Sequence, residues 1–166
     1  MDGIHQQSVD VLIETVRKDV EHGITAIMLF GVVEQSDKDE HATKASDTTS
    51  HLHEAIKQIR AEFGDTIVIM TDVCLCTATN HGHCGLVEHG HIVNDASVHR
   101  LCEIAVSHAQ AGADYVCASD MMDGRVSAIR QALETANHTS TGVLSYSVKY
   151  ASSFYGCLLY TSPSPR

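Results

Sequence analysis

Three cysteines that lie close together in the sequence have the clearest chemistry. Cys74, Cys76 and Cys84 have the spacing C-x-C-x7-C, which differs from the C-x2-C pairs of zinc fingers. Three thiolates suit the soft, tetrahedral coordination of zinc. A catalytic zinc site keeps its fourth position open, whereas a structural site has a fourth protein ligand. The loop therefore predicts a metal site, and His81 and His83 leave open which kind it is.

Other residues capable of chemistry follow expected strands. Asp72 precedes the cysteines, where it would either orient a metal-bound group or accept backbone N–H bonds. Ser119 and Asp120 follow a later strand, and Lys149 follows the last one. A lysine at the mouth of an α/β barrel can form a Schiff base with a carbonyl substrate when its amine is partly neutral. Position alone nevertheless favours an ordinary surface lysine at 149.

Helical and strand patterns alternate along the chain and would position these residues. Helices are expected over 9–20, 52–63, 94–111 and 124–136, the last with Val126, Ile129 and Leu133 facing inward. Strands are expected over 24–30, 66–70, 114–118 and 142–146, and long loops over 34–50 and 74–91. Apolar strands that alternate with amphipathic helices indicate the α/β class with a parallel sheet. Sites in such folds lie at the carboxyl ends of the strands.

A closed barrel is favoured over an open nucleotide-binding sheet. The sequence contains neither G-x-G-x-x-G nor G-x-x-x-x-G-K-[ST]. A (β/α)8 barrel needs eight strands, so the strands expected here would form an incomplete barrel.

Composition narrows the class of protein further. The chain has 166 residues, 43% of them hydrophobic, which is enough for one domain with a core. A formal net charge of −10 argues against nucleic acid as a partner. Apolar runs are too short for a membrane span and no signal peptide is evident, so we expect a soluble, cytoplasmic protein. In a reducing cytosol, Cys102 and Cys117 are expected to be small core residues.

Several motifs together resemble the porphobilinogen synthase (5-aminolevulinate dehydratase) family. The segments that are similar to the family are TDVCLC at 71–76, HGHCGL at 81–86, IVNDA at 92–96, AVSHA at 105–109, AGAD at 111–114, SDMMDGR at 119–125, SYSVKYAS at 145–152 and FYG at 154–156. The resemblance runs from about Met1 to Gly156 and implies roughly the first half of a TIM barrel.

The resemblance implies a lyase that condenses two 5-aminolevulinate molecules into porphobilinogen in tetrapyrrole and heme biosynthesis. Three cysteines would hold a catalytic Zn²⁺, and Lys149 matches a Schiff-base lysine. The implied metal ligands are Cys74, Cys76 and Cys84, and His83 matches a histidine associated with a secondary metal site in some members of the family. The implied pocket residues are Asp72, Ser119, Asp120, Tyr155 and Arg125, of which Arg125 fits a structural ion pair equally well. Magnesium is left open for the full-length protein, which the resemblance implies to be a homo-octamer.

The sequence departs from the family after Gly156. Where the family continues with Pro-Phe-Arg, residues 157–166 read CLLYTSPSPR. We therefore expect a partial barrel domain over 1–156 and a non-native tail over 157–166. A second Schiff-base lysine is also absent, so the isolated chain is expected to be inactive and, with an open sheet edge, to aggregate.

Two other functions remain open at this point. One is a zinc-binding structural or thiol-redox module, which would need a fourth protein ligand and no Lys149. The other is a Schiff-base aldolase on a similar barrel, which would not need zinc.

Overall fold

The computed structural model describes residues 5–148, so Lys149, Tyr155 and the expected tail over 157–166 lie outside the described residues. The predicted alternation of helices and strands is confirmed. The helices are α1 (Val9–Glu21), α2 (His51–Phe63), α3 (Asn94–Ala111) and α4 (Arg125–Thr135). The strands are β1 (Ala26–Leu29), β2 (Val68–Val73), β3 (Leu86–Glu88), β4 (His91–Val93), β5 (Tyr115–Ala118) and β6 (Gly142–Ser145).

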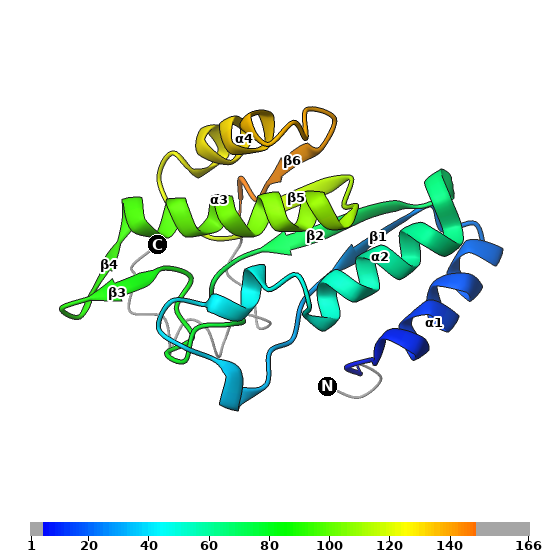
Figure 1. Ribbon diagram of the computed structural model, residues 1–166, viewed down its shortest axis with the longest axis horizontal. Helices are drawn as coiled ribbons and strands as arrows, with labels where there is room; N and C mark the ends of the chain where they lie inside the picture. The colour runs from blue at the N-terminus through cyan, green and yellow to red at the C-terminus, as the bar shows by residue number, and fades with distance from the viewer. Residues whose placement is uncertain (1–4, 149–166) are drawn as a thin grey trace.

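Four of these strands form a parallel sheet in the order β1-β2-β5-β6. Each new strand of this sheet adds beside the previous one, and each helix packs against the next, α1 on α2, α2 on α3 and α3 on α4 (Figure 1). A doubly wound sheet would reverse its strand order and place helices on both faces. Consecutive parallel strands beside one continuous helical layer are instead part of a (β/α)8 barrel, as predicted.

Helix ends follow local capping signals. Ser50 precedes α2, and its side chain accepts a hydrogen bond from the backbone N–H of His53. Gly64 ends the same helix at φ 56°, a conformation that costs glycine little. Two short 3-10 helices, η1 (Gln35–Asp37) and η2 (Thr43–Ser46), lie in the segment expected to be a plain loop.

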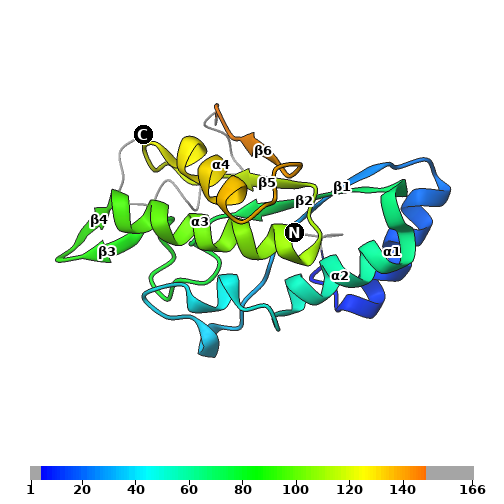
Figure 2. The same cartoon turned by 45° about the horizontal axis from the view of Figure 1, so that its top comes forward.

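The core lies between the sheet and the helices. Along β2 the burial alternates, with Ile69, Thr71 and Val73 buried on the helix side. One apolar cluster joins β1 and β2 to α1 and α2, and a second joins β2 and β5 to α3 and α4. Figure 2 shows α2 and α3 running along the sheet one after the other. The second cluster extends beyond β2 into the cysteine loop, so the loop is anchored in the core.

Three details of the sequence prediction were wrong. Strand β2 runs over 68–73 rather than 66–70 because its end pairs with β5, Asp72 opposite Cys117. The expected loop over 74–91 contains most of an antiparallel hairpin, β3–β4, which projects beside the start of α3 (Figure 1). Val126 is 39% exposed and does not face inward, whereas Ile129 and Leu133 are fully buried.

Of the two remaining described cysteines, the core prediction is confirmed for Cys117 and only partly for Cys102. Cys117 is fully buried in β5, and Cys102 is half-buried against the second cluster.

Candidate active site

The register of the sheet brings three segments with chemically capable residues to the carboxyl edge of the sheet, where its parallel strands end. Val73, Ala118 and Ser145 lie side by side at the carboxyl ends of β2, β5 and β6. The backbone N–H of Ser119 reaches the carbonyl of Val73 at 3.3 Å, and that of Tyr146 reaches the carbonyl of Ala118 at 3.3 Å. The residues that follow each strand therefore begin next to one another, as the barrel prediction requires.

The cysteine sulfurs converge at this edge. The Sγ atoms of Cys74 and Cys76 are 3.2 Å apart, and those of Cys74, Cys76 and Cys84 all lie within 4.8 Å of one another. All three are free thiols, Cys74 buried and the other two half-buried. Sulfurs bound tetrahedrally at ~2.3 Å from a zinc ion would lie about 3.8 Å apart. The donor set thus fits a thiolate-binding ion after small side-chain shifts.

Packing and hydrogen bonds fix both ends of this loop. Leu75, between the first two cysteines, is fully buried in the core and so anchors the cysteines on either side of it. The Thr79 hydroxyl donates to the carbonyl of His83 at 3.0 Å, directly before Cys84. After it, the N–H of Leu86 donates to the Ser97 hydroxyl on α3 at 2.8 Å. Cys84 is therefore held from both sides.

The crowded thiols disfavour ionisation in the absence of a cation. The hydrogen bond with Cys76 favours the Cys74 thiolate, but the neighbouring Cys84 sulfur and burial outweigh it and raise the pKa of Cys74 to about 11. The pKa of Cys76 is also raised, first by its hydrogen bond to Cys74, then by Cys84 and by burial. A bound cation would reverse this balance by stabilising the thiolates.

The two loop histidines lie outside the sulfur group. Among the described residues, the metal-competent group contains only Cys74, Cys76 and Cys84. The rings of His81 and His83 stack with centroids 5.1 Å apart, and the N–H of His83 donates to Nδ1 of His81 at 3.1 Å. The backbone of His83 thus takes part in a hydrogen bond within the loop, and a role for His83 at a metal site stays a prediction.

Asp120 is a buried carboxyl beside the cysteines. It is 3% exposed, and its Oδ1 accepts the N–H of Met122 at 2.7 Å. Burial raises the pKa of Asp120 to about 6, although the Met122 N–H and the Arg125 guanidinium oppose the shift. Charge on Cys74 raises it further. A carboxyl with such a pKa can gain or lose a proton near neutral pH.

Arg125 makes contacts within its own turn. Its Nε lies 3.5 Å from Oδ2 of Asp120, and its Nη1 donates to the carbonyl of Met122 at 3.0 Å. These contacts match the structural ion-pair alternative for Arg125, and a substrate contact stays a prediction.

Of the four remaining predicted site residues, the structure describes two. Asp72 lies in β2 opposite Cys117, and its charge raises the pKa of the Cys117 thiol, although burial has the larger effect. Ser119 directly follows β5. Lys149 and Tyr155 lie outside the described residues.

A small cavity adjoins the site. It has a volume of about 30 Å³ and is lined by Asp72, Cys74 and His108, together with Lys44 and Ser50 from the 34–50 segment. A cavity of this size holds one or two water molecules rather than a small-molecule substrate. Sequence reasoning missed the 34–50 segment as a wall of the site because its polar composition carries no periodic signal.

Comparison with known proteins agrees with the fold. The family model described as delta-aminolevulinic acid dehydratase matches residues 1–161. The chain belongs to the delta-aminolevulinic acid dehydratase family. The Methanothermus sociabilis member is 44% identical over 99% of this chain and 51% of its own length. The Archaeoglobus fulgidus member is 48% identical over 86% of this chain and 45% of its own length.

A solved structure from the same family has a closely similar fold. The delta-aminolevulinic acid dehydratase (porphobilinogen synthase) of Toxoplasma gondii, in complex with the reaction product porphobilinogen, superposes with a TM-score of 0.89 at 43% identity. The match covers 94% of this chain and 45% of that one. The chain thus spans about half the length of the family members it matches. None of the helices in the described part has the length and apolar character required to cross a bilayer.

Proposed function

We propose that this chain is part of a porphobilinogen synthase, a lyase that condenses two 5-aminolevulinate molecules to porphobilinogen. Family membership supports the proposal, since the matched relatives carry the name of that enzyme. The single observation that carries it is the group of three cysteine sulfurs within 4.8 Å at the carboxyl edge of the sheet.

Zinc is the ion that best suits this group. Thiolates are soft ligands, and an all-cysteine set favours zinc over magnesium or calcium. The described residues supply three ligands to the group rather than four, which is typical of a catalytic site. When bound there, zinc would supply Lewis-acid polarisation of a substrate oxygen at its open position.

The protein side chains have separate roles in the proposal. The amine of Lys149 adds to the ketone carbon of one substrate and water leaves, which forms an imine that holds the substrate. Asp120, with a pKa of about 6, accepts or returns a proton near the metal site. Asp72, Ser119 and Tyr155 line the pocket.

Trapping of the imine tests the substrate assignment. The chain is incubated with 5-aminolevulinate and borohydride and then digested with a protease. The masses of its lysine-containing peptides are measured by mass spectrometry. We expect a reduced adduct on Lys149, absent from a Lys149→Met variant. Lys57, whose amine donates to the carbonyl of Thr48, serves as the internal control lysine. An equal adduct on both lysines, or none on Lys149, contradicts the Schiff-base assignment.

A thiol-redox module is the second candidate, and the 3.2 Å contact between Cys74 and Cys76 favours it. Such a module would form a reversible disulfide between neighbouring thiols and would not depend on metal. Thiol counting under a series of redox buffers separates the two. A stable disulfide at the cytosolic redox potential would support the module, and three persistent thiols that bind zinc would support the synthase.

The family resemblance also leads us to propose that the intact protein is a homo-octamer and works in the cytoplasm. Light scattering on the full-length protein tests the first proposal, and a trimer or monomer would contradict it.

A further inference from the structure

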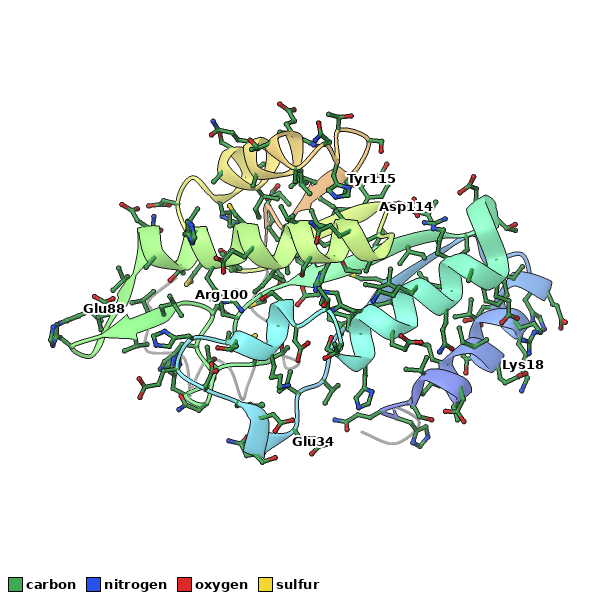
Figure 3. The ribbon with its side chains drawn as sticks, in the orientation of Figure 1. Lys18, Glu34, Glu88, Arg100, Asp114 and Tyr115 are labelled. Atoms are coloured by element: carbon green, nitrogen blue, oxygen red, sulfur yellow. The ribbon has the colours of Figure 1, made fainter. Side chains whose placement is uncertain are left out.

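Arg100 on α3 holds a segment that lies far from it in the sequence. Its Nε donates to the carbonyl of His41 at 3.0 Å, and its Nη2 donates to the carbonyls of Ala42 and Thr43 at 3.0 and 3.1 Å. Nη2 also donates to the hydroxyl of Ser46 at 2.8 Å. Figure 3 shows Arg100 on α3 above the segment that contains η2. One guanidinium therefore fixes three consecutive carbonyls of the 39–46 segment.

The conformation of this segment needs such an anchor. Ala42 adopts a left-handed conformation at φ 53° and is fully buried against the core. A residue with a Cβ is strained in this region, and the surrounding contacts must hold it there. The same turn is fixed from the other side by Asp39, whose Oδ1 accepts the N–H groups of His41 and Thr43 at 3.0 and 2.9 Å.

The anchored segment is joined directly to the cysteine loop. Asp39 and Thr79 form an isolated parallel bridge. The N–H of Asp39 donates to the carbonyl of Ala78 at 3.2 Å, and the N–H of Asn80 donates to the carbonyl of Asp39 at 3.0 Å. This bridge fixes the part of the loop that lies between Cys76 and Cys84.

The last contact reaches the third cysteine. Thr79 is 1% exposed, and its hydroxyl donates to the carbonyl of His83, which precedes Cys84. Cys74 and Cys76 instead follow β2 directly and flank the buried Leu75. Of the three sulfurs, the position of Cys84 therefore depends most on contacts made outside the sheet.

We propose that Arg100 is a positioning residue for the metal site: through the 39–46 segment and the Asp39–Thr79 bridge it holds Cys84 in place. This inference rests on the proposed metal site. Side chains that orient metal ligands without touching the ion commonly affect metal affinity by 10–100-fold. Because Arg100 acts through several contacts, we expect an effect near the lower end of this range.

Zn²⁺ affinity of the whole 166-residue chain, measured by competition with a chelator, tests the inference. We expect Arg100→Met to bind Zn²⁺ about tenfold more weakly than the wild type. Arg100→Lys should fall between them, because a lysine can reach some of the carbonyls but lacks the planar fork. If Arg100→Met does not fold, the Arg100→Lys result still decides the question.

Arg130 offers a matched control. Like Arg100, it lies on a helix and donates to backbone carbonyls of a neighbouring segment. Its Nη1 donates to the carbonyl of Thr141 at 2.6 Å and its Nη2 to that of His138 at 3.1 Å. Both acceptors lie in the connection between α4 and β6. Arg130→Met should lose stability on denaturant unfolding much as Arg100→Met does, yet keep the wild-type affinity. A general loss of stability would instead lower the affinity of both variants.

Cobalt substitution reports on the ligands themselves. In the Co²⁺-loaded Arg100→Met chain, sulfur-to-cobalt charge-transfer absorption should fall, because Cys84 binds only part of the time. Wild-type affinity and an unchanged cobalt spectrum in Arg100→Met would overturn the role of Arg100 while leaving the metal site intact. A wild-type chain that binds no Zn²⁺ would instead reject the metal site itself.

Discussion

Gly85 lies so close to Ile92 that a Cβ built on it would come 2.5 Å from the Cγ2 of Ile92, with the Ser97 hydroxyl at 3.1 Å. Gly85 directly follows Cys84, and Ile92 belongs to β4. The contact packs the hairpin tightly against the residue next to a proposed metal ligand. Only a residue without a side chain fits at this position.

Gly85→Ala should therefore move the loop and weaken Zn²⁺ binding. We expect a loss of roughly 1–3 kcal/mol in the free energy of unfolding, as for other overpacked sites, and a reduced affinity in chelator competition. Gly142→Ala is the matched control, because a Cβ there would lie 2.3 Å from Cε1 of Tyr115. Tyr115 begins β5 (Figure 3), at the end of the sheet opposite the cysteines. Equal effects of the two variants on affinity would contradict the local role of Gly85.

Metal removal should lower thermal stability through the three clustered cysteines. A ligand present at 100 times its dissociation constant stabilises the folded state by about 2.7 kcal/mol. Addition of a chelator should therefore lower the Tm of the wild-type chain but not that of Cys84→Ser. Cys102→Ser should respond to the chelator like the wild type, because Cys102 lies outside the sulfur group. If a chelator still lowers the Tm of Cys84→Ser, the metal binds at another site.

The buried histidine on α3 should make stability depend on pH. Nδ1 of His108 bonds the Thr71 hydroxyl at 3.1 Å, and its ring lies 5.2 Å from that of His53. Burial, reinforced by charge on His53, lowers the pKa of His108 to about 3. The unfolded chain, with a pKa of about 6.5, takes up the proton first as the pH falls.

The resulting stability is complete above pH 6.5 and is lost as the pH falls from there toward 3. One proton corresponds to a slope of about 1.4 kcal/mol per pH unit within this window. Denaturant unfolding at several pH values measures it. His108→Gln stays neutral throughout, so its unfolding free energy should lack this component of the slope. Identical slopes for the two proteins would show that His108 does not cause the effect.

Arg60 should stabilise the fold without affecting the metal site. It donates to the carbonyl of Gly112 at 3.1 Å and to that of Gly64 at 2.6 Å, and Nη2 lies 2.5 Å from the carboxylate of Asp114. These contacts lie at the amino end of β5, opposite the cysteines. We expect Arg60→Met to cost roughly 2 kcal/mol in unfolding free energy and to leave Zn²⁺ affinity unchanged.

Local signals made most of the fold predictable. Apolar periodicity located the helices, and the structure adds the caps Ser50 and Gly64 at the ends of α2. The end of β2 depended on pairing with β5, which no local pattern encodes. The β3–β4 hairpin turns at His89 and Gly90, both with positive φ. The sequence did not indicate this turn because a histidine stands where such turns usually have Asn or Asp.

The part of the candidate site that depends on the type and spacing of nearby residues was predictable. The spacing of the cysteines predicted a cluster, and the structure brings the three sulfurs together. The contribution of the 39–46 segment was not predictable, because Arg100 and Asp39 reach the cysteine loop mainly through backbone groups. Such contacts leave no residue pattern in the sequence. The roles of Lys149 and the pocket residues stay predictions.

X-ray absorption at the zinc edge of the Zn²⁺-loaded chain tests the central claim most directly. We predict one zinc per chain with three sulfur ligands at about 2.3 Å and one lighter, non-protein ligand. The lighter ligand should exchange when 5-aminolevulinate is added. A fourth protein ligand, sulfur or imidazole, that does not exchange would contradict an open catalytic site and would identify a structural zinc module.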